Sequence, residues 1–194
     1  MANKSKKEHI LKIASGLFNK QGIRATGVDQ VVSESQIAKM TLYNHFQSKD
    51  ELVLAYLRGQ DEQWRKWFES SVNKQGTNPS EKLLAIYDVL GEWFEDPDFN
   101  GCTYIKTASE FLDRSHIYFE AAHHYKMFMR EFIASLVEEL ETSNREALTN
   151  RLFLLVEGAI TTRMMQTDLE SARHARETAE VILEKFIQNK RQPT

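Results

Sequence analysis

TGVDQVVSESQIAKMTLYNHF, residues 26–46, is the stretch that decides the fold, because it predicts two short helices joined by a tight turn. Thr26 and Asp29 have the spacing of a capping box, in which side-chain oxygens satisfy the free backbone N–H groups of a helix start. Ser35-Gln36 is the predicted turn, and Ile37 is expected to fill the gap between the helices. A second helix over residues 38–44 completes a helix-turn-helix at about 28–47.

The apolar positions of this motif separate a buried face from an exposed one. Val28, Val31, Val32 and Leu42 recur at helical spacing and are expected to point inward. A helix-turn-helix places its second helix in the major groove of DNA. The residues expected to contact DNA are Thr26, Gly27, Val28, Gln36, Lys39, Met40, Thr41, Tyr43, Asn44, His45 and Lys49.

These residues have different expected roles. Lys39 and Tyr43 are expected at phosphates or base edges, Met40 and Thr41 in the groove, and His45 and Lys49 on the DNA backbone. Thr26 and the amide of Gly27 or Val28 begin a helix, where the free N–H groups favour a phosphate.

The flanking residues strengthen this interpretation, since a pair of short amphipathic helices is common by itself. An apolar stripe at helical spacing precedes the motif and ends at Gly22; it consists of Ile10, Ile13, Ala14, Leu17 and Phe18. Ser48 and Glu51 then form a capping box that opens a long helix.

The runs ILKIASGLF (10–18) and KMTLYNHFQSKDEL (39–52) closely resemble the N-terminal domain of the tetracycline-repressor (TetR) family of bacterial regulators. The resemblance covers about residues 6–56. It implies a DNA-binding domain over 5–65 and an effector-binding and dimerisation domain over 66–194. Two positions depart from the family pattern: Gln36 replaces the usual Gly of the turn, and Met40 replaces a small residue. We expect Met40 to alter the preferred operator.

Helix start signals and the scarcity of strand-like alternation predict an all-α protein of about nine helices, with a three-helix N-terminal head. Starts are expected at Lys49, Pro79, Cys102, Ser115, Ser143 and Thr167, and the last helix is expected to end at Asn189.

Composition narrows the class of protein. Residues 1–50 hold eight Lys and Arg against four Asp and Glu, whereas residues 51–194 hold 17 against 24. A basic N-terminal part on an acidic body is typical of a protein that meets nucleic acid at one end. The N-terminus resembles no signal peptide, no apolar run is long enough for a membrane span, and one cysteine fits a reducing compartment. We expect a cytoplasmic, nucleoid-associated protein.

Two apolar stripes near the C-terminus are candidates for a homodimer surface. They consist of Leu148, Leu152, Leu155, Val156 and Ala159, and of Ala175, Ala179, Ile182, Leu183 and Phe186. The stripes could equally close a core within one chain. The resemblance favours the dimer, because the family pairs its last two helices into an intermolecular four-helix bundle. A dimer reading two half-sites implies a near-palindromic operator.

The middle of the chain is rich in aromatic residues, which are ordinarily core. The resemblance implies that some of them line an effector pocket for a flat, apolar or aromatic small molecule. The expected pocket residues are Trp64, Trp67, Phe68, Tyr87, Phe94, Tyr104, Phe111, Tyr125, Phe128 and Glu157. Lys106, Glu110 and Arg163 are further candidates for its polar groups. Effector binding is expected to tilt the helix that begins at Lys49 and to release the DNA.

Other functional classes have weaker support. Glu120 and His123 match the Glu-x-x-His step of di-iron bundles, with His116 and His124 nearby, but a second copy is missing from the sequence. Cys102 follows Gly101 at a helix start, where a redox role is an alternative to packing. No nucleophile–base set and no glycine-rich phosphate loop is present, so we expect neither enzyme activity nor a cofactor. A helix-turn-helix used for protein contacts remains a further alternative.

Overall fold

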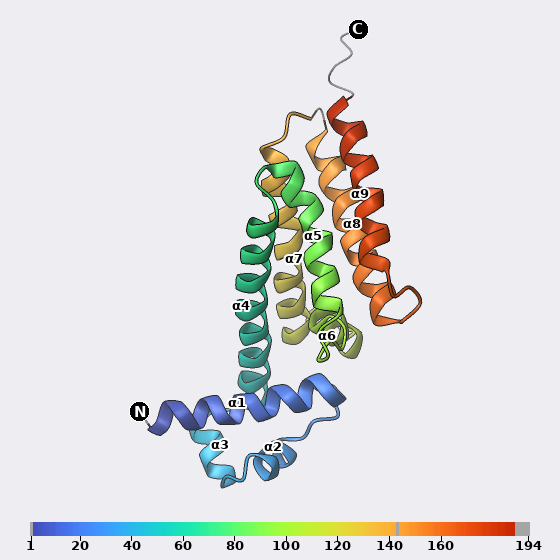
Figure 1. Ribbon diagram of the computed structural model, residues 1–194. Coiled ribbons are helices and arrows are strands. Elements are labelled where there is room, and N and C mark those ends of the chain that lie inside the picture. The colour runs from blue at the N-terminus through green and yellow to red at the C-terminus, as the bar shows by residue number, and fades with distance from the viewer. Residues whose placement is uncertain (1, 143, 189–194) are drawn as a thin grey trace. The chain divides into compact units, whose positions relative to one another are not determined.

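A computed structural model of the protein describes residues 2–142 and 144–188 (Figure 1). This part of the chain is all-α, without strands, which confirms the predicted fold class. Its nine helices are α1 (Ala2–Gln21), α2 (Val28–Glu34), α3 (Lys39–His45), α4 (Lys49–Gln75), α5 (Pro79–Phe94), α6 (Thr103–Glu110), α7 (Ile117–Glu138), α8 (Arg145–Met164) and α9 (Ser171–Gln188). No helix within the described residues is both long and apolar enough to cross a bilayer.

The chain forms two compact units. The first contains the N-terminal segment up to Gln63 together with Thr103–Tyr125, and the second contains Trp64–Cys102 and the segment from Lys126 onward. The first division lies close to the predicted boundary at residues 65 and 66. The association of residues 103–125 with the N-terminal helices was not expected from the sequence. Helices α4 and α7 each continue from one unit into the other.

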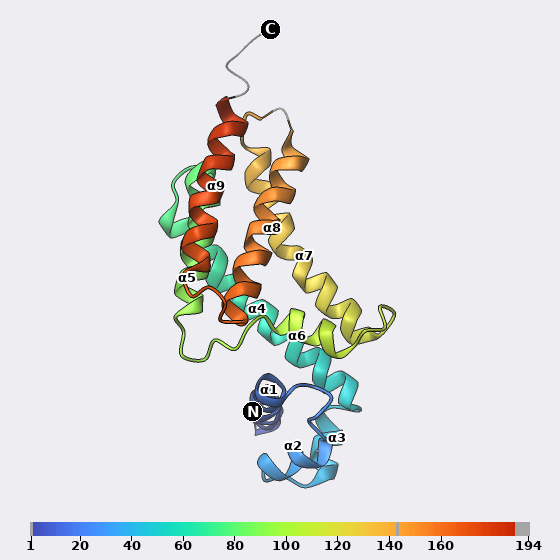
Figure 2. The ribbon, with the colours of Figure 1, turned by 90° about the vertical axis from the view of Figure 1, so that its right-hand side faces the viewer.

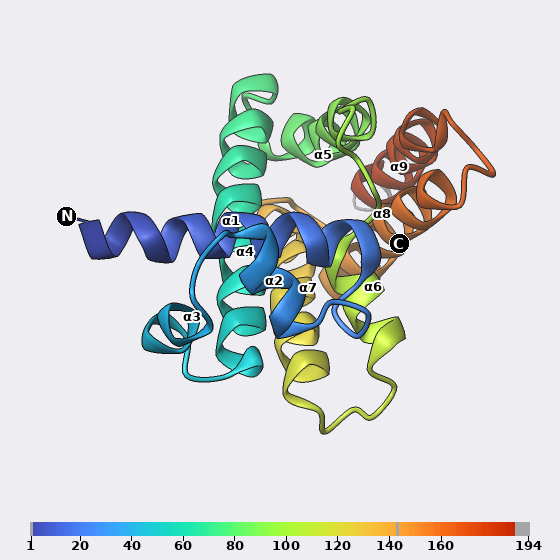
Figure 3. The ribbon, with the colours of Figure 1, turned by 90° about the horizontal axis from the view of Figure 1, so that it is seen from below.

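The first unit is organised around α1, with α2 and α3 beneath it in Figure 1 and toward the viewer in Figure 3. Burying aliphatic and aromatic side chains of this size contributes about 1.5–3 kcal/mol each, so this core holds the short helices in place. Its buried residues are Ile10, Ala14, Phe18, Ile23, Val31, Leu42, Phe46, Leu52, Val53, Tyr56, Leu57, Phe111 and Tyr118.

The second unit is a helical bundle in which α9 packs against both α5 and α8 (Figure 2). The hydroxyl of Tyr87 on α5 donates to the backbone carbonyl of Leu152 on α8 at 3.0 Å, which satisfies a fully buried polar group. Within this unit α4 and α7 meet through aromatic side chains, with Phe68 5.6 Å from Phe132 between ring centroids.

Several helix starts have the predicted caps. The Ser48 hydroxyl accepts the Glu51 amide at 3.1 Å, while the Glu51 carboxylate accepts the amide of Gln47. Asn78 caps α5 by accepting the amide of Glu81 at 3.0 Å, with Pro79 in the first turn. Both starts therefore follow from side-chain oxygens that satisfy free backbone donors.

Other starts differ from the prediction. Ser115 does not begin α7; the ring of His116 accepts the amide of Tyr118 instead. Helix α9 begins at Ser171 rather than near Thr167, because residues 165–170 form the turn after α8. Asn144 caps α8 by accepting the amide of Ala147 at 3.0 Å. Ser143 and Asn189 lie outside the described residues.

Candidate functional site

The turn between α2 and α3 has the left-handed backbone conformation that usually requires glycine. Gln36 has a φ of 53°, and the amide of Ile37 donates to the carbonyl of Val32 at 3.3 Å. A side chain in this region costs roughly 1–2 kcal/mol relative to the right-handed one. The first unit therefore tolerates local strain at Gln36 to set the angle between the two helices.

Helix α3 presents a row of solvent-exposed side chains. Met40 is 71% exposed and Tyr43 40% exposed, and Asn44 is also exposed, whereas Leu42 is fully buried. Gln36 is exposed beside them, while Thr41 and His45 are half-buried. The motif thus has the predicted buried and exposed faces.

Lys39, at the start of α3, forms an ion pair with Asp29 of α2. Its Nζ lies 2.6 Å from the Asp29 carboxylate, and both side chains are largely exposed. The hydrogen bond to Asp29 raises the pKa of Lys39. The ammonium expected at a phosphate is thus held by a neighbouring acid when DNA is absent.

Thr26 does not cap α2 as predicted. It is fully buried, and its hydroxyl donates to the carbonyl of Gly22 at 2.7 Å. Gly27 occupies the N-cap position without a side-chain hydrogen bond. The hydroxyl of Thr26 therefore stabilises the loop after α1 and is too buried to meet a phosphate.

Lys49 also differs from the expectation of a clamp on the DNA backbone. Its ammonium donates to the carbonyl of Ile23 at 2.7 Å, and the side chain is half-buried. Burial lowers the pKa of Lys49. Because the Lys49 ammonium donates a hydrogen bond to a backbone carbonyl of the α1–α2 loop, it connects that loop to α4.

Glu110 and Lys106 of α6 hold α1 and the following loop rather than serving as polar groups of a pocket. The Glu110 carboxylate accepts the amide of Ile23 at 3.1 Å and that of Arg24 at 2.7 Å. The Lys106 ammonium donates to the backbone carbonyl of Asn19 at 3.2 Å and to its side chain at 2.9 Å. These contacts explain why α6 belongs to the first unit, which no helical pattern in the sequence indicated.

The aromatic residues predicted to line one pocket are divided between the two units. Phe111 lies in the core of the first unit, where its ring meets that of Tyr118 at 4.8 Å, and Tyr104 and Tyr125 pack against the same core. In the second unit Trp64 stacks on Phe68 with ring centroids 4.7 Å apart. Phe128 packs edge-on against Trp64 and completes a cluster in the second unit.

The remaining predicted pocket residues have structural partners or are exposed. Tyr87 is buried with its hydroxyl bonded, Phe94 is buried at the end of α5, and Trp67 is 37% exposed. Glu157 pairs with the ammonium of Lys126 at 3.0 Å. Burial disfavours the charged form of Lys126, but Cys102 and Glu157 outweigh this effect and raise its pKa. The Cys102 thiol is buried, 3.6 Å from that ammonium.

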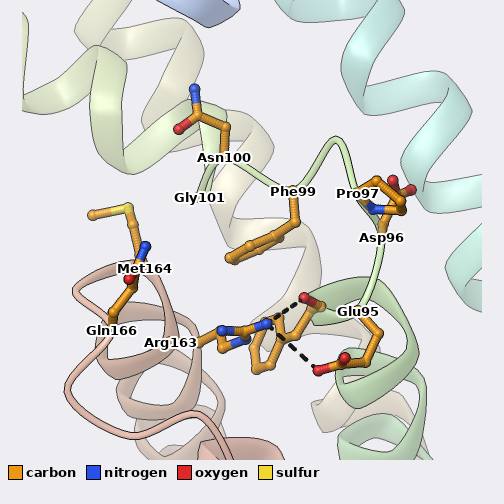
Figure 4. A pocket seen from close by; sticks show the side chains of 10 residues that line it. Glu95, Asp96, Pro97, Phe99, Asn100, Gly101, Arg163, Met164 and Gln166 are labelled. Atoms are coloured by element: carbon orange, nitrogen blue, oxygen red, sulfur yellow. Dashed lines mark hydrogen bonds and ion pairs between the residues drawn. The ribbon is translucent and has the colours of Figure 1, made fainter.

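A pocket of about 330 Å³ lies at a different place in the second unit, between the loop after α5 and the end of α8 (Figure 4). It is lined by Phe94, Glu95, Asp96, Pro97, Phe99, Asn100, Gly101, Arg163, Met164 and Gln166. Of these residues, only Phe94 and Arg163 were predicted from the sequence to belong to a pocket. The others lie in a loop and a turn, where no periodic pattern reveals a shared cavity.

The stripes predicted to form a dimer surface are mostly buried within the single chain. Three of their residues, Leu155, Ile182 and Phe186, are half-buried, and the others are buried: Leu148, Leu152, Val156, Ala159, Ala175, Ala179 and Leu183. They join α8 and α9 to each other and to α5, which is the alternative that the sequence left open. A different face of α8 carries exposed Leu154 and Gly158, and Met165 at the C-cap of this helix is also exposed.

Glu120, His123 and His124 are exposed on α7. Within residues 2–142 and 144–188, no group of three or more His, Cys, Asp or Glu side chains is arranged to hold a metal ion.

Comparisons with known proteins agree with this geometry. The family described as "Bacterial regulatory proteins, tetR family" matches residues 10–56, which span the helix-turn-helix. The chain is 23% identical over 174 residues to the HTH-type transcriptional regulator YjdC of Escherichia coli K12, covering 88% of this chain and 91% of that protein. It is 26% identical over 130 residues to the HTH-type transcriptional regulator QacR of Staphylococcus aureus, covering 59% and 69%.

A solved structure extends the likeness beyond the first unit. SCO4454, a TetR-family transcriptional regulator from Streptomyces coelicolor, superposes with a TM-score of 0.85 at 23% identity, covering 93% of this chain and 89% of that one. At this identity the structural likeness establishes the fold. Together with the matched helix-turn-helix and the relatives, it shows that the chain belongs to the TetR family of bacterial transcriptional regulators.

Proposed function

We propose that the protein is a homodimeric repressor that binds a near-palindromic operator and leaves it when a small-molecule effector binds. The observation that carries the proposal is the exposed row of Lys39, Met40 and Tyr43 on a helix whose opposite side is buried. A helix with solvent-exposed outward side chains is what the major groove accepts. Such a protein acts in the cytoplasm, where the bacterial chromosome lies.

Dimerisation follows from the limited reach of one short helix. Helix α3 has seven residues and contacts few base pairs, so useful specificity requires a second copy. The exposed face of α8, with Leu154, Gly158 and Thr161 at helical spacing and Met165 at the C-cap, supports a dimer through that face. A Cβ placed on Gly158 meets no atom within 4 Å, which leaves room for a partner helix to approach.

Release by an effector requires coupling between the two units. Helix α4 runs without interruption from Lys49 to Gln75 and so belongs to both of them. An effector that binds better when α4 is tilted shifts the dimer toward the state that does not fit the operator. Operator DNA must then weaken effector binding by the same factor. Repression rather than activation is favoured, because the relatives KstR2 of Mycobacterium tuberculosis and NemR of Escherichia coli K12 are named transcriptional repressors.

Selection of bound sequences from a random pool of duplex DNA tests the DNA-binding part. The purified full chain should recover a near-palindrome with two equal half-sites. The variant with Met40→Ala and Tyr43→Ala should lose the enrichment but keep its fold, because both side chains are exposed. Recovery of no preferred sequence by the unaltered protein would refute sequence-specific binding.

A further inference from the structure

The pocket between the α5–α6 loop and the end of α8 has one cationic side chain, that of Arg163, which is half-buried. The guanidinium nitrogen Nη2 of Arg163 donates to the carbonyl of Phe94 at 2.8 Å and lies 3.4 Å from the Glu95 carboxylate. Among the residues that the structure describes, the neighbouring Nε is buried without a hydrogen-bond partner. A buried donor left unpaired costs about 1–3 kcal/mol, so an acceptor at this edge would be stabilising.

The present counter-ion of Arg163 is a weak one. Glu95 is 77% exposed while Arg163 is 18% exposed, and 3.4 Å is long for a charge-assisted bond. Since Glu95 is exposed to solvent, an ion pair of this kind contributes roughly 0.2–1 kcal/mol. A ligand carboxylate that reaches both Nε and Nη2 would form two parallel bonds, the geometry that guanidinium groups favour.

The rest of the pocket sets the character of the ligand. Phe99 lies 5.9 Å from the Arg163 guanidinium and, in Figure 4, directly above it. The ring of Phe99 also packs against Phe94 at 5.1 Å and therefore has a fixed position. Met164 and Gln166 close one side in the same view, and Asp96 and Pro97 close the other. A volume of about 330 Å³ suits a small molecule rather than a peptide.

From this arrangement we infer that the pocket binds a small monocarboxylate, with its carboxylate on the Nε–Nη2 edge of Arg163 and its body against Phe99. The role of this carboxylate as the effector rests on the proposed function. It also moves the effector site away from most of the aromatic residues predicted from the sequence, of which only Phe94 lines this pocket. The pocket loop ends just before α6, and α6 carries Glu110, which binds the backbone after α1. The chain itself thus provides a short route from the pocket to the helix-turn-helix.

Calorimetric titration of the full chain with three acids and their primary amides tests the inference. The probes are benzoate, phenylacetate and hexanoate, with benzamide, phenylacetamide and hexanamide as uncharged controls of the same shape. At least one acid should bind, at least tenfold more tightly than its amide, since 1.4 kcal/mol corresponds to about tenfold. Equal binding of acid and amide, or no binding of any acid, would overturn the assignment.

Two variants separate a ligand role of Arg163 from a structural one. Glu95→Gln removes the competing carboxylate and should tighten acid binding about two- to fivefold without changing the amide. Asp98→Asn removes the same charge from an exposed loop residue that does not line the pocket, and should leave binding unchanged. Arg163→Lys keeps the charge but loses the planar edge and should weaken acid binding about tenfold or more. Equal effects of Glu95→Gln and Asp98→Asn would contradict the model of direct competition.

The failure of this inference and that of the proposed function are distinguishable. Operator affinity is measured on the same preparations, with and without the acid that binds. Operator binding without any acid binding would overturn the pocket assignment and leave DNA recognition standing. Acid binding that leaves operator affinity unchanged would keep the site but refute its role as the effector site. Inorganic phosphate that binds as tightly as the acids would reveal a general anion seat and overturn the carboxylate assignment.

Discussion

The carboxylate of Asp29 on α2 lies 2.6 Å from the ammonium of Lys39 on α3. This pair joins the two helices of the motif on their solvent side, while Val31 and Leu42 join them in the core. Because both charges are exposed, the pair itself contributes little to stability. The pair has a consequence for the proposed DNA binding: a phosphate that approached Lys39 would compete with Asp29 for the only ammonium on α3.

Neutralising Asp29 should therefore strengthen DNA binding. Asp29→Asn frees Lys39 and removes a negative charge, so affinity should rise for operator and unrelated duplexes alike. Lys39→Ala should lower affinity for both and reduce the slope of log affinity against log salt by about one unit. Fluorescence anisotropy across a salt series measures both quantities. Glu34→Gln, the same charge change at the end of α2, serves as a control and should have the smaller effect.

Met40 and Tyr43 should determine sequence preference rather than overall affinity. Met40→Ala removes an exposed apolar side chain suited to a thymine methyl group, so preference should change at one position in each half-site. The expected discrimination is about 1–3 kcal/mol for a well-placed base contact. Binding to a set of singly substituted operators gives this value. A uniform change across all positions would place Met40 outside the bases.

Replacing Gln36 by glycine should stabilise the protein. A left-handed φ of 53° costs a residue with a side chain roughly 1–2 kcal/mol, which glycine would avoid. Glycine also has more conformational freedom in the unfolded chain, and this offsets about 0.4–1 kcal/mol of the stabilisation. We expect a net increase of about 1 kcal/mol or less in the free energy of unfolding, from urea denaturation. Gln63→Gly, at an exposed site inside α4, should instead destabilise by roughly 1 kcal/mol. A loss of stability in Gln36→Gly would mean that the turn is not strained.

Glu110 should be required for the stability of the first unit. Its carboxylate accepts two backbone amides of the α1–α2 loop, and Glu110→Gln leaves one of them facing an NH₂ group. A charge-assisted bond of this type contributes about 1.5–3 kcal/mol, so unfolding should become easier by a comparable amount. Glu120→Gln, an exposed change on α7, is the matched control and should be neutral within about 0.5 kcal/mol. Similar melting curves for both variants would show that α6 does not hold the loop.

An acidic side chain on the exposed face of α8 should prevent dimerisation. Leu154 is 71% exposed in the single chain, so Leu154→Glu leaves its fold intact but places a charge at the centre of the proposed contact. Sedimentation should show the mass of one 22.5 kDa chain instead of two. Leu112→Glu makes the same change at an 82% exposed loop position and should leave the dimer unchanged. A dimeric Leu154→Glu protein would place the interface elsewhere.

The features that could be predicted from the sequence are those that depend on neighbouring residues, namely helix starts and the buried and exposed faces of helices. Capping residues such as Ser48 and Asn78 satisfy backbone donors three residues away, so their helix starts could be located without a fold. The apolar spacing of α2 and α3 likewise predicted which side chains are exposed. The prediction that Thr26 caps α2 was wrong, because its hydroxyl can bond either to a free amide in the first turn of α2 or to a carbonyl that precedes it in the chain. It donates to the carbonyl of Gly22.

Contacts between distant segments were beyond such patterns. Glu110 meets Ile23 across 87 positions, and nothing in the composition of α6 distinguishes this contact from a polar group in a pocket. The stripes on α8 and α9 could serve either a dimer or a core, and their spacing alone does not reveal that α9 packs against α5 and α8 within one chain. The pocket around Arg163 combines a loop and a turn, for which the sequence has no periodic signal.

The most direct test of the central claim is the affinity of the dimer for the selected operator and for a shuffled duplex of the same composition, at low and moderate salt. Reading of bases by α3 predicts a preference of about a thousandfold or more that persists at moderate salt, because base contacts do not depend on counterion release. Equal affinities that both vanish as salt rises would show that the protein holds only the phosphate backbone, and would contradict its assignment as an operator-specific repressor.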